Sequence, residues 1–224
     1  MPLLHHLDQA TGLPIRKLKP VRYEKERPGE LVHVDIKKLG IIPDGGGWRV
    51  HGRNSAQARR VGAASDRAAR RGASPSRGYV FLHHAVDDHS RLAYSERLPD
   101  ERKETAAAFW GRARAFFAEH GVTVTAVMTD NGACYRSRLF AAALGAGVAH
   151  RRTRPFRPQT NGKVERFNRT LAAEWAYAKP YTSEAEREAA YIEWLHHYNH
   201  HRPHTGLAGS APAQRVHNLT GKNT

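Results

Sequence analysis

The sequence predicts an α/β domain in which helices flank a mixed β-sheet of five strands. Short runs rich in β-branched residues alternate along the chain with longer runs in which apolar residues recur at every third or fourth position. Their order is strand, strand, strand, helix, strand, helix, strand, helix, helix, which is typical of α/β architectures. At 224 residues, 40% of them hydrophobic, the chain is long enough for one such domain with arms.

The chain is expected to begin with an extended arm and then enter the sheet. Residues 1–30 contain four prolines and no apolar periodicity, which predicts the arm. The first strand is expected at residues 31–36, where valine and isoleucine occupy every second position. Asp35 falls on the opposite face in the middle of this strand, which is an unusual place for a carboxylate.

A hairpin is expected after a long insertion. Residues 43–78 are rich in Gly, Ala, Ser and Arg and have too few large apolar side chains to form a core of their own. Residues 79–86 and 91–98 then have strand character. Asp87 and Asp88 lie between these two strands, where we expect turn residues rather than metal ligands, because aspartate accepts hydrogen bonds from a turn backbone.

The remaining elements alternate between helices and strands. Helices are expected at residues 104–120, 137–144, 161–178 and 183–200, and strands at residues 122–129 and 147–150. Thr160 or Asn161 is expected to cap the third of these helices. The whole order describes a ribonuclease H-like fold better than a doubly wound one. We expect the core to span residues 31–205 and a C-terminal tail to follow at 206–224.

Three carboxylates have positions that predict a common site. Asp35 lies in the first strand and Asp130 directly follows the strand after the long helix, and these two strands are expected to be neighbours. Glu165 lies in the first turn of the helix at 161–178, beside the apolar face that meets the sheet. Carboxylates in such places are costly unless they are paired, hydrogen-bonded or bound to a cation.

Three oxygen ligands without a thiolate suit Mg²⁺ or Mn²⁺. Two such ions can stabilise both the attacking and the leaving oxygen of a displacement at phosphorus. The only cysteine, Cys134, can form neither an intramolecular disulfide nor a thiolate cluster, and we expect a small buried thiol. The residues therefore predict a two-metal enzyme that acts on phosphodiesters.

The carboxylates and their surroundings resemble the DDE triad of bacterial insertion-sequence transposases with an integrase catalytic core. The resemblance lies in five strings in matching order: HVDIKK from His33, VDDHSR from Val86, TDNG from Thr129, RPFRPQTNGKVER from Arg154 and YNHHRPH from Tyr198. Together they cover roughly residues 16–220. Each string alone is weak, but five in order are not explained by chance.

The resemblance implies a role for each carboxylate in a Mg²⁺-dependent DNA transposase, a polynucleotidyl transferase. Asp35 would bridge both ions, while Asp130 and Glu165 would each hold one. Water would release a 3′-hydroxyl at the transposon end, and that hydroxyl would attack the target DNA without a covalent enzyme intermediate. Members of this family carry a helix-turn-helix region before the core, and a 30-residue arm is too short for one, so we expect a catalytic core without that region.

The charge of the chain predicts a polyanionic partner. The formal net charge is +15 and the sequence pI about 10.4. Residues 49–78 contribute +7 and residues 150–169 contribute +6. The second stretch surrounds Glu165 and gives the expected contacts to DNA phosphates, which are Arg151, Arg152, Arg154, Arg157, Lys163, Arg166 and Arg169. The first stretch is equally consistent with a solvated insertion.

Two other functions and the setting of the protein complete the expectations. A non-catalytic DNA-binding remnant of a truncated transposase would retain the charge but not the activity, and a generic ribonuclease H-like nuclease would hydrolyse DNA without joining strands. We expect double-stranded DNA, both transposon ends and target, as the partner of a homo-oligomer. No apolar run is long enough for a membrane span and no signal peptide is evident, so we expect a cytoplasmic bacterial protein that is nucleoid-associated when bound to DNA.

Overall fold

The computed structural model describes residues 24–57, 59–60, 63, 78–153 and 161–217. Residues 1–23 of the expected arm, part of the insertion and the last residues of the tail lie outside this part. The strands are β1 (Val32–Gly40), β2 (Tyr79–Asp87), β3 (Ala93–Leu98), β4 (Ala126–Thr129) and β5 (Ala149–Arg152). The helices are α1 (Trp48–His51), α3 (Lys103–Glu119), α4 (Arg138–Leu144), α5 (Gly162–Leu171), α6 (Glu184–His200) and α7 (Pro212–His217). A π-helical turn, η3 (Ala172–Ala176), continues α5, and a 3₁₀ turn, η4 (Thr205–Leu207), follows α6.

The five strands form one mixed sheet in the order β3-β2-β1-β4-β5. β2 pairs antiparallel with both β1 and β3, whereas β4 pairs parallel with both β1 and β5. The predicted sheet is therefore confirmed. The expected neighbourhood of the strands that contain or precede Asp35 and Asp130 is confirmed as well, because β1 and β4 are hydrogen-bonded to each other.

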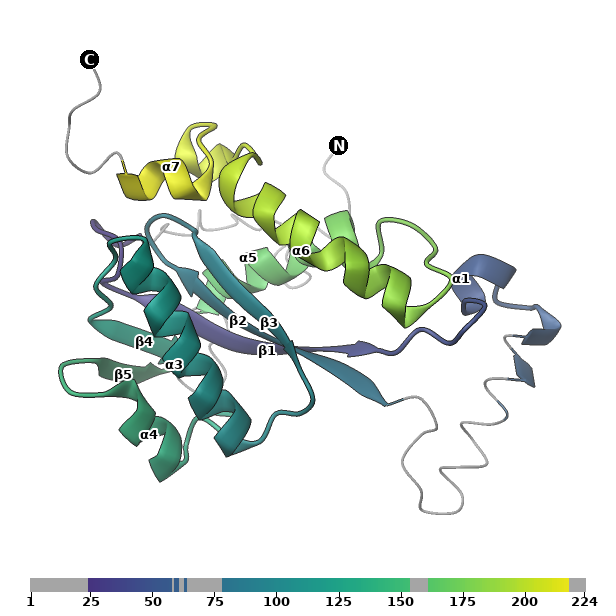
Figure 1. Ribbon diagram of the computed structural model, residues 1–224, viewed down its shortest axis with the longest axis horizontal. Helices are drawn as coiled ribbons and strands as arrows, with labels where there is room; N and C mark the ends of the chain where they lie inside the picture. Colours follow the sequence, from purple (N-terminus) through teal and green to yellow (C-terminus); the bar gives the residue numbers. More distant parts are fainter. Residues whose placement is uncertain (1–23, 58, 61–62, 64–77, 154–160, 218–224) are drawn as a thin grey trace, which may run out of the picture.

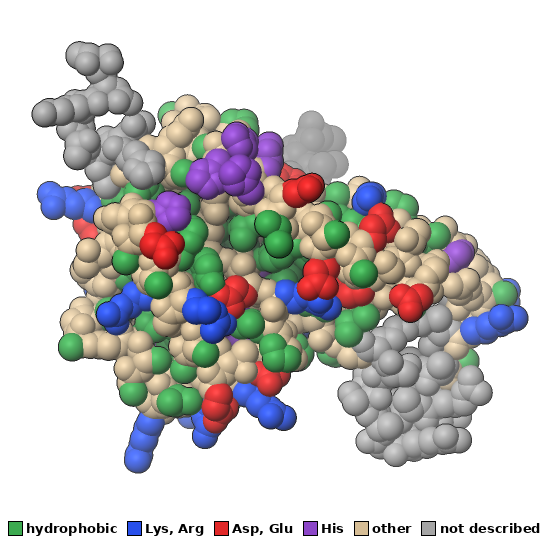
Figure 2. Space-filling view, viewed as in Figure 1, with side chains coloured by type: hydrophobic (Ala, Val, Ile, Leu, Met, Phe, Trp, Pro, Cys, Tyr) green, Lys and Arg blue, Asp and Glu red, His purple; other side chains and the backbone are tan. Residues whose placement is uncertain are grey.

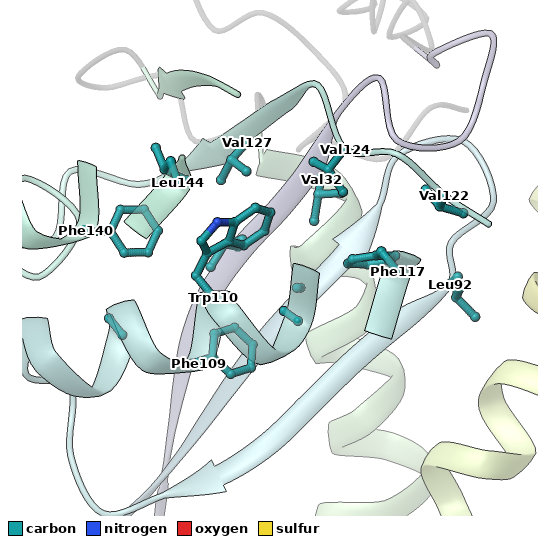
Figure 3. Packing of buried hydrophobic residues seen from close by; sticks show 14 of the residues in the cluster. Val32, Leu92, Phe109, Trp110, Phe117, Val122, Val124, Val127, Phe140 and Leu144 are labelled. Carbon is teal, nitrogen blue, oxygen red and sulfur yellow. The ribbon is translucent and has the colours of Figure 1, made fainter. Parts of the chain in front are cut away.

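Helices cover both faces of the sheet (Figure 1). On one face, the side chains of α3 and α4 pack on β1 and β4 around Trp110, which is fully buried with Val32, Val127 and Phe140 around it (Figure 3). On the other face, α5 and α6 form a second cluster with β2 and the end of β1. The buried side chains of α5 and η3 in this cluster are Val164, Phe167, Leu171 and Trp175, the spacing that predicted an apolar helix face.

Alternation along β1 assigns its residues to the two faces. Val32 and Val34 belong to the α3 side, whereas Leu39 belongs to the α5 side. Asp35 shares the parity of Leu39 and so faces α5. The expected placement of Asp35 in mid-strand is confirmed.

Several element boundaries differ from the expectation, among them those of β4 and β5. β4 begins only at Ala126, although Val122 and Val124 before it are buried. β5 begins at Ala149 and includes Arg151 and Arg152, which were expected in a loop. Arginine is accommodated there because β5 is an edge strand whose residues pair with β4 while these side chains remain exposed.

Part of the expected C-terminal tail is helical. In α7, Ala213 and Val216 are buried in the cluster on the α3 side. Throughout the described ranges, each helix is either too short or too polar to cross a lipid bilayer.

Candidate active site

The sheet brings Asp35 and Asp130 together. His33 of β1 lies opposite Met128 of β4 in a parallel pair, and Asp35 and Asp130 each follow two residues later. Parallel strands keep their register, so the two aspartates meet at the same edge. Asp35 is half-buried in the sheet, whereas Asp130 is exposed just beyond its strand.

The surroundings of Asp35 disfavour its charge. Burial raises the pKa of this carboxyl, and the neighbouring charge of Asp130 raises it further. Asn168 of α5 opposes this effect, because its Nδ2 donates a 2.9 Å hydrogen bond to Oδ2 of Asp35. A cation bound between the two aspartates would offset both the burial and the repulsion.

A tight turn orients the carboxylate of Asp130. Its Oδ1 accepts a 2.8 Å hydrogen bond from the backbone N–H of Gly132. A Cβ atom at Gly132 would lie 2.9 Å from that same oxygen, so a larger residue would displace it. Asn131 secures the turn from the other side by donating to the backbone oxygen of Thr153 at 2.8 Å.

Glu165 stands apart from the two aspartates. It lies in the first turn of α5 and is exposed, while its neighbour Val164 is buried against the sheet. Among the described residues, no three Asp, Glu, His or Cys side chains are close enough to hold one metal ion. The fold thus joins two of the three predicted carboxylates and leaves the third on the helix beside them.

Buried hydrogen bonds fasten the start of α5 to β1. Nδ1 of His33 lies 2.8 Å from Oδ1 of Asn161, and Nε2 of His33 lies 2.9 Å from Oδ1 of Asp88. All three side chains are almost completely buried. Asn161 does occupy the N-cap position, as expected, but its side chain makes no capping hydrogen bond. It contacts His33 instead, which links the helix that bears Glu165 to the strand that bears Asp35.

Both aspartates of the hairpin were expected as turn residues; Asp88 lies in the turn and Asp87 ends β2 beside it, but only the Asp87 side chain bonds within the turn. Oδ2 of Asp87 accepts hydrogen bonds from the backbone N–H and the hydroxyl of Ser90, both at 2.7 Å, as a turn residue should. Asp88 instead contacts His33, and its Oδ2 accepts a 2.7 Å bond from the backbone N–H of Lys25. The only sequence signal was that His33 shares a strand face with Asp35.

The balance of charge around Asp88 favours its ionised form. Burial alone would raise its pKa. The hydrogen bonds from His33 and Lys25, together with the charge of Lys163, outweigh that effect and hold the pKa below its ordinary value. Nζ of Lys163 lies 3.6 Å from Oδ1 of Asp88, so this lysine, expected at a DNA phosphate, is half-buried and faces the hairpin in this structure.

The other expected DNA contacts divide into two groups. Arg151 and Arg152 are exposed on β5, and Arg166 and Arg169 are exposed on α5. Arg154 and Arg157 fall outside the described residues. The thiol of Cys134 is buried as expected, and burial raises its pKa to about 11, so it is not a ready nucleophile.

The fold is ribonuclease H-like. A chain of the simian T-cell lymphotropic virus intasome, solved with the PP2A regulatory subunit B56 gamma, matches 95% of this chain and 64% of its own at a TM-score of 0.59 and 19% identity. The HTLV-2 integrase catalytic core domain, solved in complex with magnesium, matches 86% of this chain and 99% of its own at a TM-score of 0.55 and 14% identity. These likenesses confirm the predicted fold.

The chain belongs to the integrase core domain family. The family matches residues 25–158, and a second family of the same description matches residues 146–212. An uncharacterized 39.2 kDa protein of insertion element IS476 from Xanthomonas euvesicatoria is 34% identical over 131 residues, which are 58% of this chain and 34% of that protein. Transposase InsD of IS2 from Escherichia coli is 31% identical over 90 residues, 39% of this chain and 29% of that protein. The matched regions span about a third of these relatives, and the predicted kinship with insertion-sequence transposases is confirmed.

Proposed function

We propose that this chain is the catalytic core of a DDE transposase that nicks DNA and transfers the strand in a metal-dependent reaction. The observation that carries the proposal is the pair Asp35 and Asp130, brought together by parallel strands and facing the helix that bears Glu165. The transposase name of the relatives from IS2 supports it.

The residues present fit divalent metal ions. Asp35 and Asp130 offer only oxygen ligands, and the raised pKa of Asp35 reflects a site that a cation would stabilise. Asp35, Asp130 and Glu165 would hold the two ions, Mg²⁺ or Mn²⁺. When bound, such ions lower the pKa of water and stabilise charge on the oxygens of a phosphodiester. The magnesium in the HTLV-2 core domain supports this assignment.

The chain itself orients the reacting groups. Asn168 holds the Asp35 carboxylate, Gly132 holds that of Asp130, and Arg166 and Arg169 provide charge for DNA phosphates. In the first step water attacks a phosphodiester, so that one P–O bond forms and the bond to the 3′-oxygen breaks. In the second step the freed 3′-hydroxyl attacks a target phosphodiester and expels a target 3′-hydroxyl, which conserves the number of phosphodiester bonds.

Double-stranded DNA, both transposon ends and target, is the proposed partner, and we expect a homo-oligomer on that DNA. The charge of +15 is consistent with such a substrate, since phosphate neutralisation dominates DNA affinity. Because DNA is the substrate, we place the site of action at the bacterial nucleoid in the cytoplasm.

The test is nicking and strand joining by the purified chain on a labelled duplex with Mg²⁺ or Mn²⁺. Asp130→Asn should abolish product while the fold survives, because Asp130 is exposed. Asp44→Asn is the matched control, since Asp44 is an exposed carboxylate in a loop. Full activity of Asp130→Asn would refute the assignment, and hydrolysis without joined product would indicate a generic nuclease.

A second candidate is a non-catalytic DNA-binding remnant, which the separation of Glu165 from the two aspartates favours. It requires salt-sensitive DNA binding without any nicking in Mn²⁺. Product that depends on Glu165 would exclude it.

A further inference from the structure

A hollow with aromatic and basic walls lies where α1 meets the turn after η3. Its volume is about 380 Å³, and its walls include Trp48, Arg49, Arg53, Tyr177, Lys179 and Pro180. Figure 2 shows this end of the molecule, where basic side chains of the α1 region reach the surface. We call this hollow the Trp48–Tyr177 pocket.

Both aromatic side chains of the pocket are unusually exposed. The exposed fraction is 45% for Trp48 and 42% for Tyr177. The other three tryptophans of the chain, Trp110, Trp175 and Trp194, are at most 8% exposed. The two partly exposed rings give the hollow a surface on which a flat ligand can stack once the guanidinium groups that lie over the rings move aside.

The charge of the pocket is largely uncompensated. The Arg49 guanidinium lies 4.5 Å from the ring of Tyr177 and 4.9 Å from that of Trp48, and Arg53 lies 4.4 Å from the ring of Trp48. Within the described part of the chain, neither arginine has a carboxylate partner, whereas Lys179 is paired with Glu186 at 2.8 Å. The ligand that suits two aromatic rings and two guanidinium groups without a carboxylate partner in the described part of the chain is flat and anionic.

A helical path connects this pocket to the candidate active site. Glu165 and Tyr177 are twelve residues apart along α5 and η3, which corresponds to about 18 Å. Arg166, Arg169, Ala173 and Tyr177 follow one another at spacings of three and four, and all are exposed. Basic side chains therefore lie along the path from Glu165 towards the pocket.

We propose that the Trp48–Tyr177 pocket binds an unpaired nucleotide of a DNA strand that runs along α5 from the phosphodiester at Glu165. The base stacks on the ring faces and the flanking phosphates contact Arg49 and Arg53. The base must be unpaired because a paired base has no free face for the protein. This inference rests on the proposed function only for the identity of the substrate.

The experiment compares the binding of a plain labelled duplex and of the same duplex with a five-nucleotide single-stranded extension. Binding is measured in EDTA, so that it is independent of cleavage. The wild-type chain should prefer the extended DNA, and the double variant Trp48→Ala/Tyr177→Ala should lose about tenfold or more in affinity for it. Affinity for the plain duplex should hardly change. Trp48→Phe, with Tyr177 unchanged, should keep the preference for extended DNA, because phenylalanine still stacks.

The controls separate this role from general charge and from folding. The Arg49→Gln/Arg53→Gln variant should reduce the salt dependence of binding by about two phosphate contacts. Ile192→Ala and Arg102→Gln, at residues 78% and 80% exposed elsewhere, should bind as the wild type does. The described part of α1 has no buried residue, so circular dichroism should show an intact fold.

The fluorescence of Trp48 gives a direct readout. Because the other tryptophans are buried, acrylamide should quench mainly Trp48, and the extended DNA should protect it. Equal affinities of wild type and pocket variants for extended DNA would overturn the proposal, and so would a loss of self-association without a loss of DNA binding. Asp130→Asn should bind extended DNA normally. A wild-type chain that binds extended DNA through the pocket but gives no product would refute the proposed function and still support the pocket.

Discussion

The two strand carboxylates and the helix carboxylate of the candidate site are positioned by different forces. Asp35 and Asp130 are set by the parallel pairing of β1 and β4, whose backbone hydrogen bonds fix the register. Glu165 is set by side chains: the apolar face of α5, the bond from Asn168 to Asp35 and the buried contacts of His33.

This difference explains why the structure joins two carboxylates and not three. A backbone ladder holds its residues without help from side chains, and the paired residues of β1 and β4 closely precede the two aspartates. The placement of α5 depends on side-chain contacts. Binding of metal and DNA would then mainly change the position of Glu165 and its helix.

The largest expected effect tests whether cleavage needs both the strand carboxylates and the helix carboxylate Glu165. Glu165→Gln and Asp35→Asn should each lower metal-dependent strand cleavage by about 10³-fold or more, because each removes a ligand worth several kcal/mol of charge stabilisation. Cleavage rates on a labelled duplex measure the loss, with Glu188→Gln as an exposed glutamate control on α6. A fully active Glu165→Gln would show that the strand pair acts alone.

The next prediction concerns the buried hydrogen bonds that hold the start of α5 against β1. Asp88→Ala should lower the free energy of unfolding by about 3 kcal/mol, because it leaves the buried His33 ring without its hydrogen-bond partner. Asp88→Asn should cost less, since the amide oxygen still accepts a hydrogen bond. Urea unfolding measures both, and a double-mutant cycle with Asn161→Ala should show coupling. Additive losses would mean that the two contacts do not act as one unit.

Acid should lower the free energy of unfolding, because a histidine is buried in the sheet. Burial lowers the pKa of His84, which pairs with Asp35 across β1 and β2, to about 3. The unfolded chain therefore binds a proton below pH 6.5 that the folded chain does not, so stability present above that pH is lost as the pH falls. We expect a loss of about 2 kcal/mol from this residue between pH 7.5 and pH 5.

Urea unfolding at the two pH values checks this loss, with His84→Gln as the comparison. The variant should depend less on pH than the wild type. The lowered pKa values of His83 and His204, the second about 4, add to the same trend in both proteins. An unchanged pH dependence in the variant would contradict the role of His84.

The smallest expected effect concerns the free energy of unfolding in the absence of metal, when the charge of Asp35 is unbalanced. Asp35→Asn should raise the free energy of unfolding by up to about 1 kcal/mol, because it removes a charge that burial and Asp130 disfavour. Thermal unfolding in EDTA measures the gain, and excess Mg²⁺ should reverse the order by stabilising only the wild type. A variant less stable than the wild type in EDTA would show that the bond from Asn168 matters more than the charge.

Much of the candidate site could be predicted from the sequence, because these features depend on local patterns of side chains. The period of two in β1 placed Asp35 in mid-strand, and the spacing of Val164, Phe167, Leu171 and Trp175 placed Glu165 beside the sheet. The helix expected at residues 183–200 begins as predicted, and Ser183 Oγ accepts a bond from the Glu186 backbone as a helix cap. These features follow from side-chain periodicity and from caps, which involve neighbouring residues only.

The tertiary structure alone decided the contacts between distant segments. His33, Asp88 and Asn161 each had an adequate local explanation as strand, turn and cap residues, yet they meet across 55 and 128 residues of sequence. The Trp48–Tyr177 pocket likewise joins residues 129 positions apart. Local preference says which conformation a residue adopts, but the partner of a buried polar group is chosen only when packing excludes water and makes an unpaired atom costly.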